Sequence, residues 1–329
     1  MERIELSNAA FEGDNNAYLF ADGTETTLVD TGDWLEGTHS QLEAALASRG
    51  VNLADIDRLF LTHWHGDHTG LAGKIQAESG ATVYLHKADA PLIRGDESAW
   101  EEMRRTQIEY FDHWGIPEAD QSELLEITKK TPYLENPPDV TPIEDGETFS
   151  VNGQGFKTVH APGHTAGQCM FETTISGGRD VLSGDALLPK YTPNVGGADV
   201  RVERPLAKYL ETLTGIADAD YDRAWPGHRE PIDDPAARAE EIFHHHEERS
   251  WRVLDALRRV GPCDTWTVSA DLFGGLEGIH MLHGPGESYA HLEHLREEDL
   301  VVQNGREYRL ADGVEERLEA REDGRWPLA

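Results

Sequence analysis

Four side chains of the kinds that bind metal ions lie within six residues of this chain, in the pattern His-x-His-x-Asp-His. They are His63, His65, Asp67 and His68. Imidazole and carboxylate groups are the ligands that hold zinc while leaving a coordination position open for water. A lone histidine here would more often be a surface residue beside the start of a helix. Three histidines and an aspartate at this spacing instead predict a metal centre.

The elements around this motif would place it at the edge of a sheet. Residues 57–61, Asp-Arg-Leu-Phe-Leu, predict a short buried strand, and residues 70–75 predict the start of a helix. The motif therefore lies on a strand-to-helix loop at the carboxyl end of a strand. Open α/β sheets build their functional sites at such ends.

Further short motifs occur in order along the chain, each near the end of a predicted strand. They are Thr-Leu-Val-Asp-Thr-Gly at 27–32, Pro-Gly-His-Thr at 162–165, Ser-Gly-Asp at 183–185 and Pro-Gly-His at 226–228. Together with the first motif, they resemble the metallo-β-lactamase superfamily over residues 1–235. The resemblance implies an α/β fold, built as a four-layer αββα sandwich.

The resemblance also implies a ligand set for two divalent metal ions. One ion would be bound by His63, His65 and His164, the other by Asp67, His68 and His228, and Asp185 would bridge the two. Asp30 would hold a ligand histidine from behind by accepting its distal N–H. Zinc is the expected metal, and iron and manganese are alternatives because they accept the same mixture of imidazole and carboxylate ligands.

This ligand set predicts a binuclear metal-dependent hydrolase in which a metal-bridging hydroxide attacks the substrate. True β-lactamases of the superfamily lack a bridging aspartate, so Asp185 makes the chain resemble the thioesterases, lactonases and nucleases instead. We expect a small-molecule ester, thioester or lactone as substrate. The alternative is a metal-dependent endoribonuclease acting on single-stranded RNA. A non-catalytic descendant is disfavoured because all seven ligand positions are intact.

Three residues are expected to contribute to catalysis beyond metal binding alone. Asp67 and Asp185 are two of them, and Tyr191 is the third because it follows Asp185 by six residues and could contact a substrate oxygen. A packing or surface role for Tyr191 fits the sequence equally well. His86, at the end of a predicted strand over 82–86, could line the site, although a lone histidine is more often structural.

Residues 88–138 predict an insertion with helices over 98–114 and 117–129. We expect it to cap the active site and to determine the substrate range; peripheral packing is the alternative. The aromatic residues that look exposed in it are Trp100, Tyr110 and Trp114.

The chain is expected to divide into a catalytic domain over 1–235 and a C-terminal domain over 236–329. The predicted elements of the second domain are helices over 236–260, 268–273 and 287–295 and a hairpin over 301–310 with an Asn-Gly turn. Three helices followed by a hairpin resemble a winged helix.

The charge of this C-terminal region argues against duplex DNA as a partner. From residue 236 onward the chain has 11 arginines, no lysine and 20 acidic residues, so its net charge is 11 − 20 = −9. A winged helix binds DNA largely by neutralising phosphates. We therefore expect the region to pack on the catalytic domain, to wall the active-site cleft or to form a homodimer contact. Binding of single-stranded RNA stays open.

The whole chain is strongly acidic. Its 329 residues include 62 Asp and Glu against 29 Lys and Arg, which gives a net charge of −33. Only seven of the basic residues are lysines. An acidic, lysine-poor composition is typical of proteins from salt-loving cells, where concentrated salt screens the self-repulsion. A surface for a basic ligand is the alternative.

Cysteine usage and hydropathy point to the cytoplasm as the expected location. The two cysteines, Cys169 and Cys263, show no metal-binding spacing and are expected to pack in the interior. The N-terminus lacks an apolar signal segment. No apolar run approaches the roughly 20 residues of a membrane helix, so no membrane contact is expected.

Overall fold

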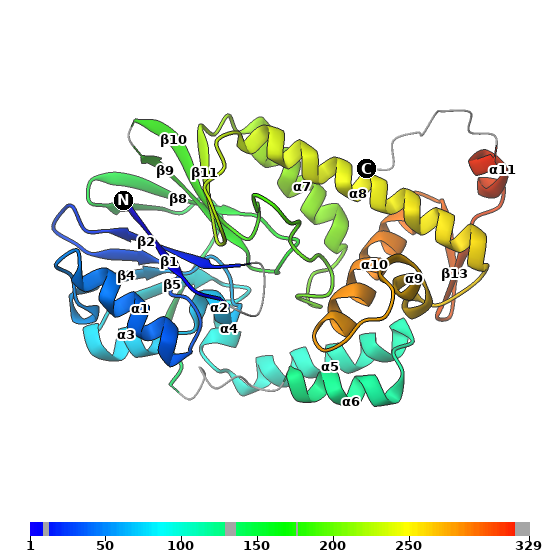
Figure 1. The fold of residues 1–329 in the computed structure, drawn as a ribbon, viewed down its shortest axis with the longest axis horizontal. Coiled ribbons are helices and arrows are strands. Elements are labelled where there is room, and N and C mark those ends of the chain that lie inside the picture. Colours follow the sequence, from blue (N-terminus) through cyan, green and yellow to red (C-terminus); the bar gives the residue numbers. More distant parts are fainter. Residues whose placement is uncertain (9–12, 129–135, 176, 320–329) are drawn as a thin grey trace.

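The computed structural model describes residues 1–8, 13–128, 136–175 and 177–319. Its two larger β-sheets lie together in one half of the molecule, on the left in Figure 1. The first sheet contains, in spatial order, β1 (Glu2–Leu6), β2 (Asn15–Phe20), β3 (Thr27–Val29), β4 (Arg58–Phe60), β5 (Thr82–His86) and β6 (Val140–Ile143). The second contains, in spatial order, β11 (Arg223–Pro226), β10 (Gly178–Gly184), β9 (Cys169–Ile175), β8 (Gln154–His160) and β7 (Thr148–Val151).

Aromatic side chains fill the space between the two sheets. Phe60 on β4 is central to this layer, and its ring stacks on Tyr84 at 4.7 Å between centroids and meets Phe171 of the second sheet edge-on at 5.3 Å. Side chains alternate between the two faces of a strand, so Leu59 points instead to the outer face of the first sheet, into a separate aliphatic cluster.

Helices cover the outer face of each sheet. The aliphatic cluster outside the first sheet includes residues of α1 (Glu36–Ala47) and α3 (Ala72–Ser79). The cluster outside the second sheet includes residues of α7 (Pro205–Asp218) and the first half of α8 (Pro235–Val260). The layers therefore follow the predicted order of helix, sheet, sheet and helix.

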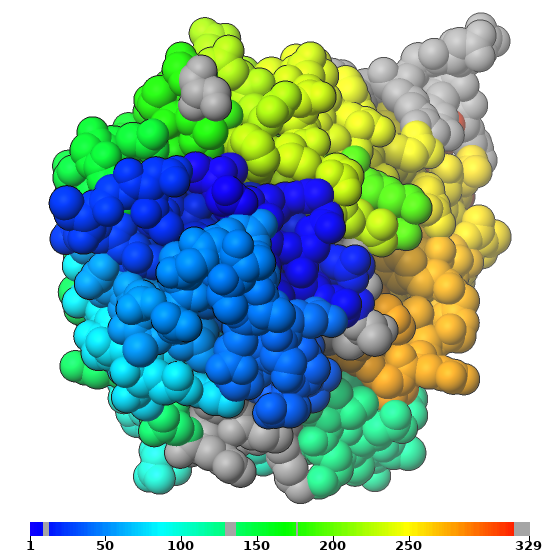
Figure 2. Space-filling model, turned by 60° about the vertical axis from the view of Figure 1, so that its left-hand side comes forward, coloured from blue at the N-terminus to red at the C-terminus, as the bar shows by residue number. Residues whose placement is uncertain are grey.

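The predicted insertion contains α4 (Ala90–Ile93), α5 (Glu97–Trp114) and α6 (Glu118–Ile127), which confirms its two main helices. Residues 129–135 lie outside the described residues. The expectation that Trp114 is exposed is wrong, because its side chain is 0% exposed. It lies with Phe111 in a cluster that also contains Met281 and Leu282 of the C-terminal helices. The space-filling view shows the insertion and those helices side by side (Figure 2).

Beyond α8, the C-terminal region continues with the expected order of elements. These are α9 (Thr265–Phe273), α10 (His280–Glu297), β12 (Val301–Asn304), β13 (Glu307–Leu310) and α11 (Val314–Glu319). The turn of the hairpin is Gly305-Arg306 rather than Asn304-Gly305, because Asn304 pairs with Glu307. The domain boundary at residue 235 and the winged-helix identity remain predictions.

Helix α10 begins seven residues before the predicted start at Glu287. Its additional segment contains Gly284, Pro285 and Gly286, a combination that ordinarily disfavours a helix. Tertiary packing overrides that preference here. All three residues are buried, and a Cβ atom on Gly286 would lie 2.2 Å from the Cα atom of Gly197. Only a residue without a side chain allows this contact between two backbones.

Among the helices of the described residues, none combines the length and the apolar character that a membrane span requires.

Candidate metal centre

The seven predicted ligands lie on loops at the same edge of the two sheets. His63 and His65 follow β4, and the one-turn helix α2 (Gly66–Thr69) carries Asp67 and His68. The other three ligands, His164, Asp185 and His228, follow β8, β10 and β11. The recurring placement of a polar side chain just beyond a strand brings residues far apart in the chain to one point.

In the part of the chain that the structure describes, three sets of three side chains lie close enough to share a metal ion. They are the first triad (His63, His65 and His164), the second triad (Asp67, His68 and His228), and a set that contains His63, His68 and Asp185. Within each triad, one atom of each side chain lies within 4.8 Å of the others. Asp185 lies between them. Its Oδ1 is 3.5 Å from His68 Nε2 and its Oδ2 is 3.8 Å from His164 Nε2.

The spacing of these atoms suits bound metal ions. Two ligand atoms bonded to one tetrahedral zinc ion lie about 3.3–3.4 Å apart. In the first triad, His65 Nδ1 is 3.0 Å from His63 Nε2 and 3.0 Å from His164 Nε2. In the second triad, Asp67 Oδ2 is 3.4 Å from His228 Nε2 and 3.7 Å from His68 Nε2.

The outward nitrogen of each of the five histidines has an oxygen acceptor. His164 Nδ1 lies 2.9 Å from the carbonyl of Asn194, His228 Nδ1 lies 3.0 Å from that of Gly13, and His65 Nε2 lies 3.3 Å from that of Ala198. A carbonyl can only accept, so each of these nitrogens carries the proton. The other ring nitrogen therefore faces the cluster, where it offers a lone pair to a metal ion whenever it carries no proton.

Asp30 orients the remaining two histidines, His68 directly and His63 through Thr62. Its Oδ2 accepts from His68 Nδ1 at 2.9 Å and from the Thr62 hydroxyl at 2.8 Å. Because Thr62 donates its only hydroxyl proton to Asp30, its oxygen accepts from His63 Nδ1 at 3.0 Å. This is the arrangement that the resemblance implied for Asp30, and it reaches one histidine of each triad.

Polar atoms buried in the cluster have no hydrogen-bond partner among the described residues. They are His68 Nε2, Asp185 Oδ1 and His228 Nε2. Buried polar groups are nearly always satisfied, and all three atoms face the centre of the cluster. A bound cation would satisfy them.

The charges in the cluster differ between the two triads. Burial and the neighbouring His164 lower the pKa of His65 to about 3, so this imidazole is neutral at pH 7. Burial opposes charge on His228 as well, but Asp185 outweighs it and raises its pKa to about 10. Burial likewise disfavours ionised Asp185, yet His228 and His68 hold its pKa well below the ordinary value. Without a metal ion, His228 is therefore a cation at pH 7 that would release a proton on binding one, whereas His65 already offers a lone pair.

An ion-paired cluster behind the first triad was not found by sequence reasoning. Asp89 accepts from the backbone N–H of Trp64 at 3.2 Å and from the Thr165 hydroxyl at 2.9 Å. It therefore joins the loop of His63 and His65 to the loop of His164. Arg201 binds Asp89 and Asp199 together. Nothing in the sequence near Asp89 identifies this role, because its partners are distant in the chain.

The two other candidate residues lie outside the triads. Tyr191 is 45% exposed, and the guanidinium of Arg229 lies 4.9 Å from the centre of its ring. Its catalytic role remains a prediction. His86 stacks on His160 with ring centroids 4.1 Å apart, which fits the structural role that a lone histidine usually has.

Comparison with a family model gives a match over residues 10–228 to the metallo-beta-lactamase superfamily. These residues include every member of both triads, Asp185 and Asp30. The match ends within the loop that carries His228, so it does not extend to α8 and the elements that follow it.

Individual proteins resemble more of the chain. A metallo-beta-lactamase family protein from Thermus thermophilus, known from its crystal structure, is 32% identical with a TM-score of 0.79, covering 94% of this chain and 98% of that one. The lactamase-like protein adaB of Aspergillus niger is 28% identical, covering 82% of this chain and 68% of its own. The probable metallo-hydrolase YqjP of Bacillus subtilis (strain 168) is 26% identical, and the match covers 88% of this chain and 90% of YqjP.

Proposed function

The chain belongs to the metallo-beta-lactamase superfamily, and on that premise we propose that it is a hydrolase that binds two divalent metal ions and cleaves a small-molecule ester, thioester or lactone. The single observation that carries the proposal is the orientation of the histidines. Each of the five has its outward nitrogen bonded to an oxygen and its other nitrogen directed at the cluster.

In the proposed site, the first triad would hold one ion, the second triad would hold the other, and Asp185, between the triads, would supply a further carboxylate ligand. When bound, the ions would supply an acidified water as nucleophile and a positive charge for the oxygen that becomes negative in the reaction. Zinc is the metal we expect. The imidazole and carboxylate donors also suit iron and manganese.

The chain's own hydroxyl and thiol groups next to the motifs are poorly suited to act as nucleophiles. Burial raises the pKa of the Cys169 thiol well above its ordinary value, so it is not ionised at pH 7. The Ser183 hydroxyl is buried and donates to the carbonyl of Leu187. The Thr62 hydroxyl donates to Asp30. These contacts support a mechanism without a covalent enzyme intermediate.

We do not propose the ribonuclease alternative, because the arginines best placed for RNA phosphates already have acidic partners. Arg306 pairs with Asp112, and Arg309 pairs with Asp312 at 3.1 Å. The chain's net charge of −33 would also repel a polyanion.

The test is metal analysis combined with a substrate panel of thioesters, lactones and single-stranded RNA, measured in high salt. We expect two metal ions per chain at saturation and hydrolysis of at least one small-molecule class. Asp185→Ala should bind at least one ion more weakly and lose at least about 100-fold in kcat/KM, since it removes a charged ligand from the centre of the site.

The matched control is Asp180→Ala, on the strand that directly precedes Asp185. Asp180 is also buried, but its partners are the backbone of Ile175 and the indole of Trp225, so we expect this variant to keep both metal ions. Fewer than two ions in the wild-type protein, or full activity in Asp185→Ala, would contradict the proposal.

A further inference from the structure

The loop over residues 194–198 contacts two of the three histidines in the first triad. The carbonyl of Asn194 accepts from His164 Nδ1 at 2.9 Å, and the carbonyl of Ala198 accepts from His65 Nε2 at 3.3 Å. The position of this one loop therefore determines how both imidazole rings are oriented.

The side chain of Asn194 holds the loop in shape from inside. Its Oδ1 accepts from the backbone N–H of Gly197 at 3.1 Å and from that of Ala198 at 2.8 Å. These two bonds connect the carbonyl that holds His164 to the carbonyl that holds His65. The amide's other end, Nδ2, points away from the loop.

That other end is bound by helix α10 of the C-terminal region. Asn194 Nδ2 donates to the carbonyl of His283 at 3.1 Å and to Glu287 Oε2 at 3.3 Å. The backbone of Gly286 lies directly against that of Gly197, so the loop and the helix are in contact at two places. The same contact accounts for the glycine at position 286 within the Gly-Pro-Gly segment of α10.

Glu287 is itself held by the next helix. Its side chain is 12% exposed, and its other oxygen, Oε1, accepts from Arg249 on α8. Burial raises the pKa of Glu287, while Arg249 and Asn194 favour its charged form. A buried carboxylate is stable only with such partners, so Arg249 keeps the acceptor in place for Asn194.

We propose that Asn194 and Glu287 are positioning residues through which the C-terminal helices complete the first metal triad. Neither residue would contact metal or substrate. They would act through the loop that orients His164 and His65. This inference rests on the proposed function, and it assigns a task to a region that lies outside the residues matched by the family model. Loss of a hydrogen-bond partner of a metal ligand typically weakens metal binding by about 10–100-fold. We expect a loss of about tenfold here, because Glu287 acts on the ligands only through Asn194 and its loop.

Two double variants isolate the contact between Glu287 and Asn194. Glu287→Gln with Arg249→Met removes both charges but keeps an oxygen that can accept from Asn194. Glu287→Leu with Arg249→Met removes both charges and the acceptor as well. Neither leaves a buried charge unpaired. Glu297→Gln, which breaks the exposed pair with Arg204 near the end of the same helix, is the control for changes elsewhere on α10.

The probe is Co²⁺ alone, titrated into metal-free protein against a chelator and followed by its visible absorption. We expect the Leu variant to bind one of two Co²⁺ equivalents about tenfold more weakly, with a changed spectrum for that equivalent. The Gln variant and Glu297→Gln should stay within about threefold of wild type. If the Leu variant does not fold, Asn194→Ala replaces it with the same expected result.

Two outcomes would overturn the inference. One is a folded Leu or Ala variant with the affinities and spectrum of the wild type. The other is an equal loss in the Leu and Gln variants, since the acceptor would then be irrelevant. Failure of the wild-type protein itself to bind two equivalents is a different result, which contradicts the proposed function first.

Discussion

Gly227 lies directly behind two of the proposed metal ligands. A Cβ atom at this position would be 2.3 Å from Asp185 Oδ1 and 2.6 Å from His68 Cε1. Both distances are too short for non-bonded atoms. The glycine of the Pro-Gly-His motif is therefore needed for space, because the side chains around it must approach one another to reach common metal ions.

We predict that Gly227→Ala weakens metal binding by at least about tenfold, since the ligands must move to admit a methyl group. Isothermal titration of metal-free protein with Zn²⁺ measures this. Gly215→Ala is the matched control, because a Cβ there meets no atom within 4 Å and an alanine within α7 should be neutral or stabilising by about 0.5–1 kcal/mol. Equal zinc affinity in both variants would show that the site tolerates the displacement.

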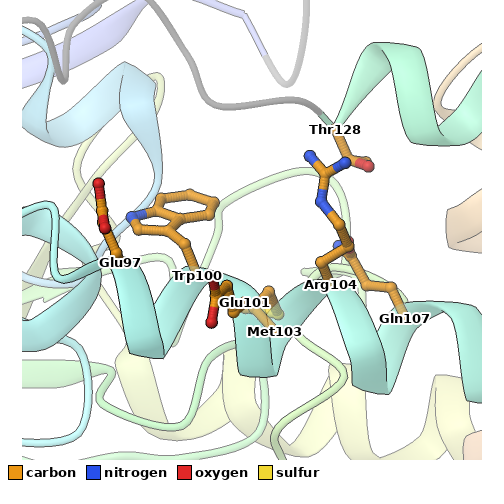
Figure 3. Close-up of a pocket in the computed structure, with 7 residues that line it drawn as sticks. All are labelled: Glu97, Trp100, Glu101, Met103, Arg104, Gln107 and Thr128. Carbon is orange, nitrogen blue, oxygen red and sulfur yellow. The ribbon is translucent and has the colours of Figure 1, made fainter.

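At the scale of elements, α5 approaches the metal centre through a pair of tryptophans. Trp100 meets Trp64 edge-on at 5.9 Å, and Trp64 meets His65 edge-on at 4.7 Å. Trp100 also borders a surface hollow of about 290 Å³ on α5 (Figure 3). Because α5 shares its core with α10, deleting the insertion would disrupt both regions. A point substitution is therefore the appropriate test of the expected role in substrate choice.

We predict that Trp100→Leu changes the ratio of kcat/KM between long-chain and short-chain substrates by about tenfold, as expected when a pocket gains or loses a few carbon atoms of contact. Metal content should be unchanged. Ile108→Ala, an exposed apolar residue on the same helix, should leave the ratio unaltered. If both variants have the wild-type ratio, the insertion serves packing only.

Helices α8 and α10 bury a pair of histidines where they meet. His246 and His291 are fully buried, with His246 Nδ1 3.3 Å from His291 Nε2. Burial lowers the pKa of His291 to about 3 and that of His246 well below its ordinary value. The charged or titratable groups around the pair are His245, Arg249, Glu287 and His294, together with Tyr209 of α7.

We predict that these helices lose stability in mild acid. Below about pH 6.5 the unfolded chain takes up a proton at each histidine, whereas folded His291 stays neutral until about pH 3. The free energy of unfolding should therefore fall as pH decreases, by about 2 kcal/mol per histidine at pH 5. His291→Asn keeps a donor for the carbonyl of Glu287. Its free energy of unfolding should therefore fall by about 2 kcal/mol less than that of the wild type when the pH decreases to 5.

Urea unfolding at pH 7.5 and at pH 5 measures this difference. His244→Asn serves as the control, because that histidine is exposed on α8, the helix that carries His246. An identical pH dependence in the wild type and in His291→Asn would show that the buried pair does not contribute.

At the scale of the whole molecule, negative charge determines which partners are accessible. The end of α10 carries Arg296, which pairs with Glu293 at 2.6 Å, and the hairpin arginines Arg306 and Arg309 also have acidic partners. If the C-terminal region is a winged helix, these three arginines already have acidic partners, and the surrounding acids would repel phosphates.

We predict no saturable binding of duplex DNA at micromolar protein. Fluorescence anisotropy with duplex DNA and single-stranded RNA, repeated across salt concentrations, measures it. Tight, salt-sensitive binding that disappears in Arg306→Ala with Arg309→Ala would contradict the prediction and restore the ribonuclease alternative.

The sequence alone predicted which seven side chains would lie close together and the order of the layers. His63, His65, Asp67 and His68 are local in the chain, and the other ligands each follow a strand whose apolar pattern is visible in sequence. The strands β1 and β6 were not predicted, because each has only two strongly apolar residues, separated by polar residues or a proline, and is recognisable mainly by its pairing with a neighbouring strand.

Apart from Asp30, only the tertiary structure decided what holds those ligands in place. Asp89 and Asn194 act on loops distant from them in sequence, and no local pattern marks such contacts. Trp114 is buried and α10 passes through Gly284–Gly286 for the same reason: packing between segments far apart in the chain outweighs the preference of each segment by itself. Spacing predicts which atoms bind a metal ion, whereas the surfaces that orient those atoms exist only once the chain has folded.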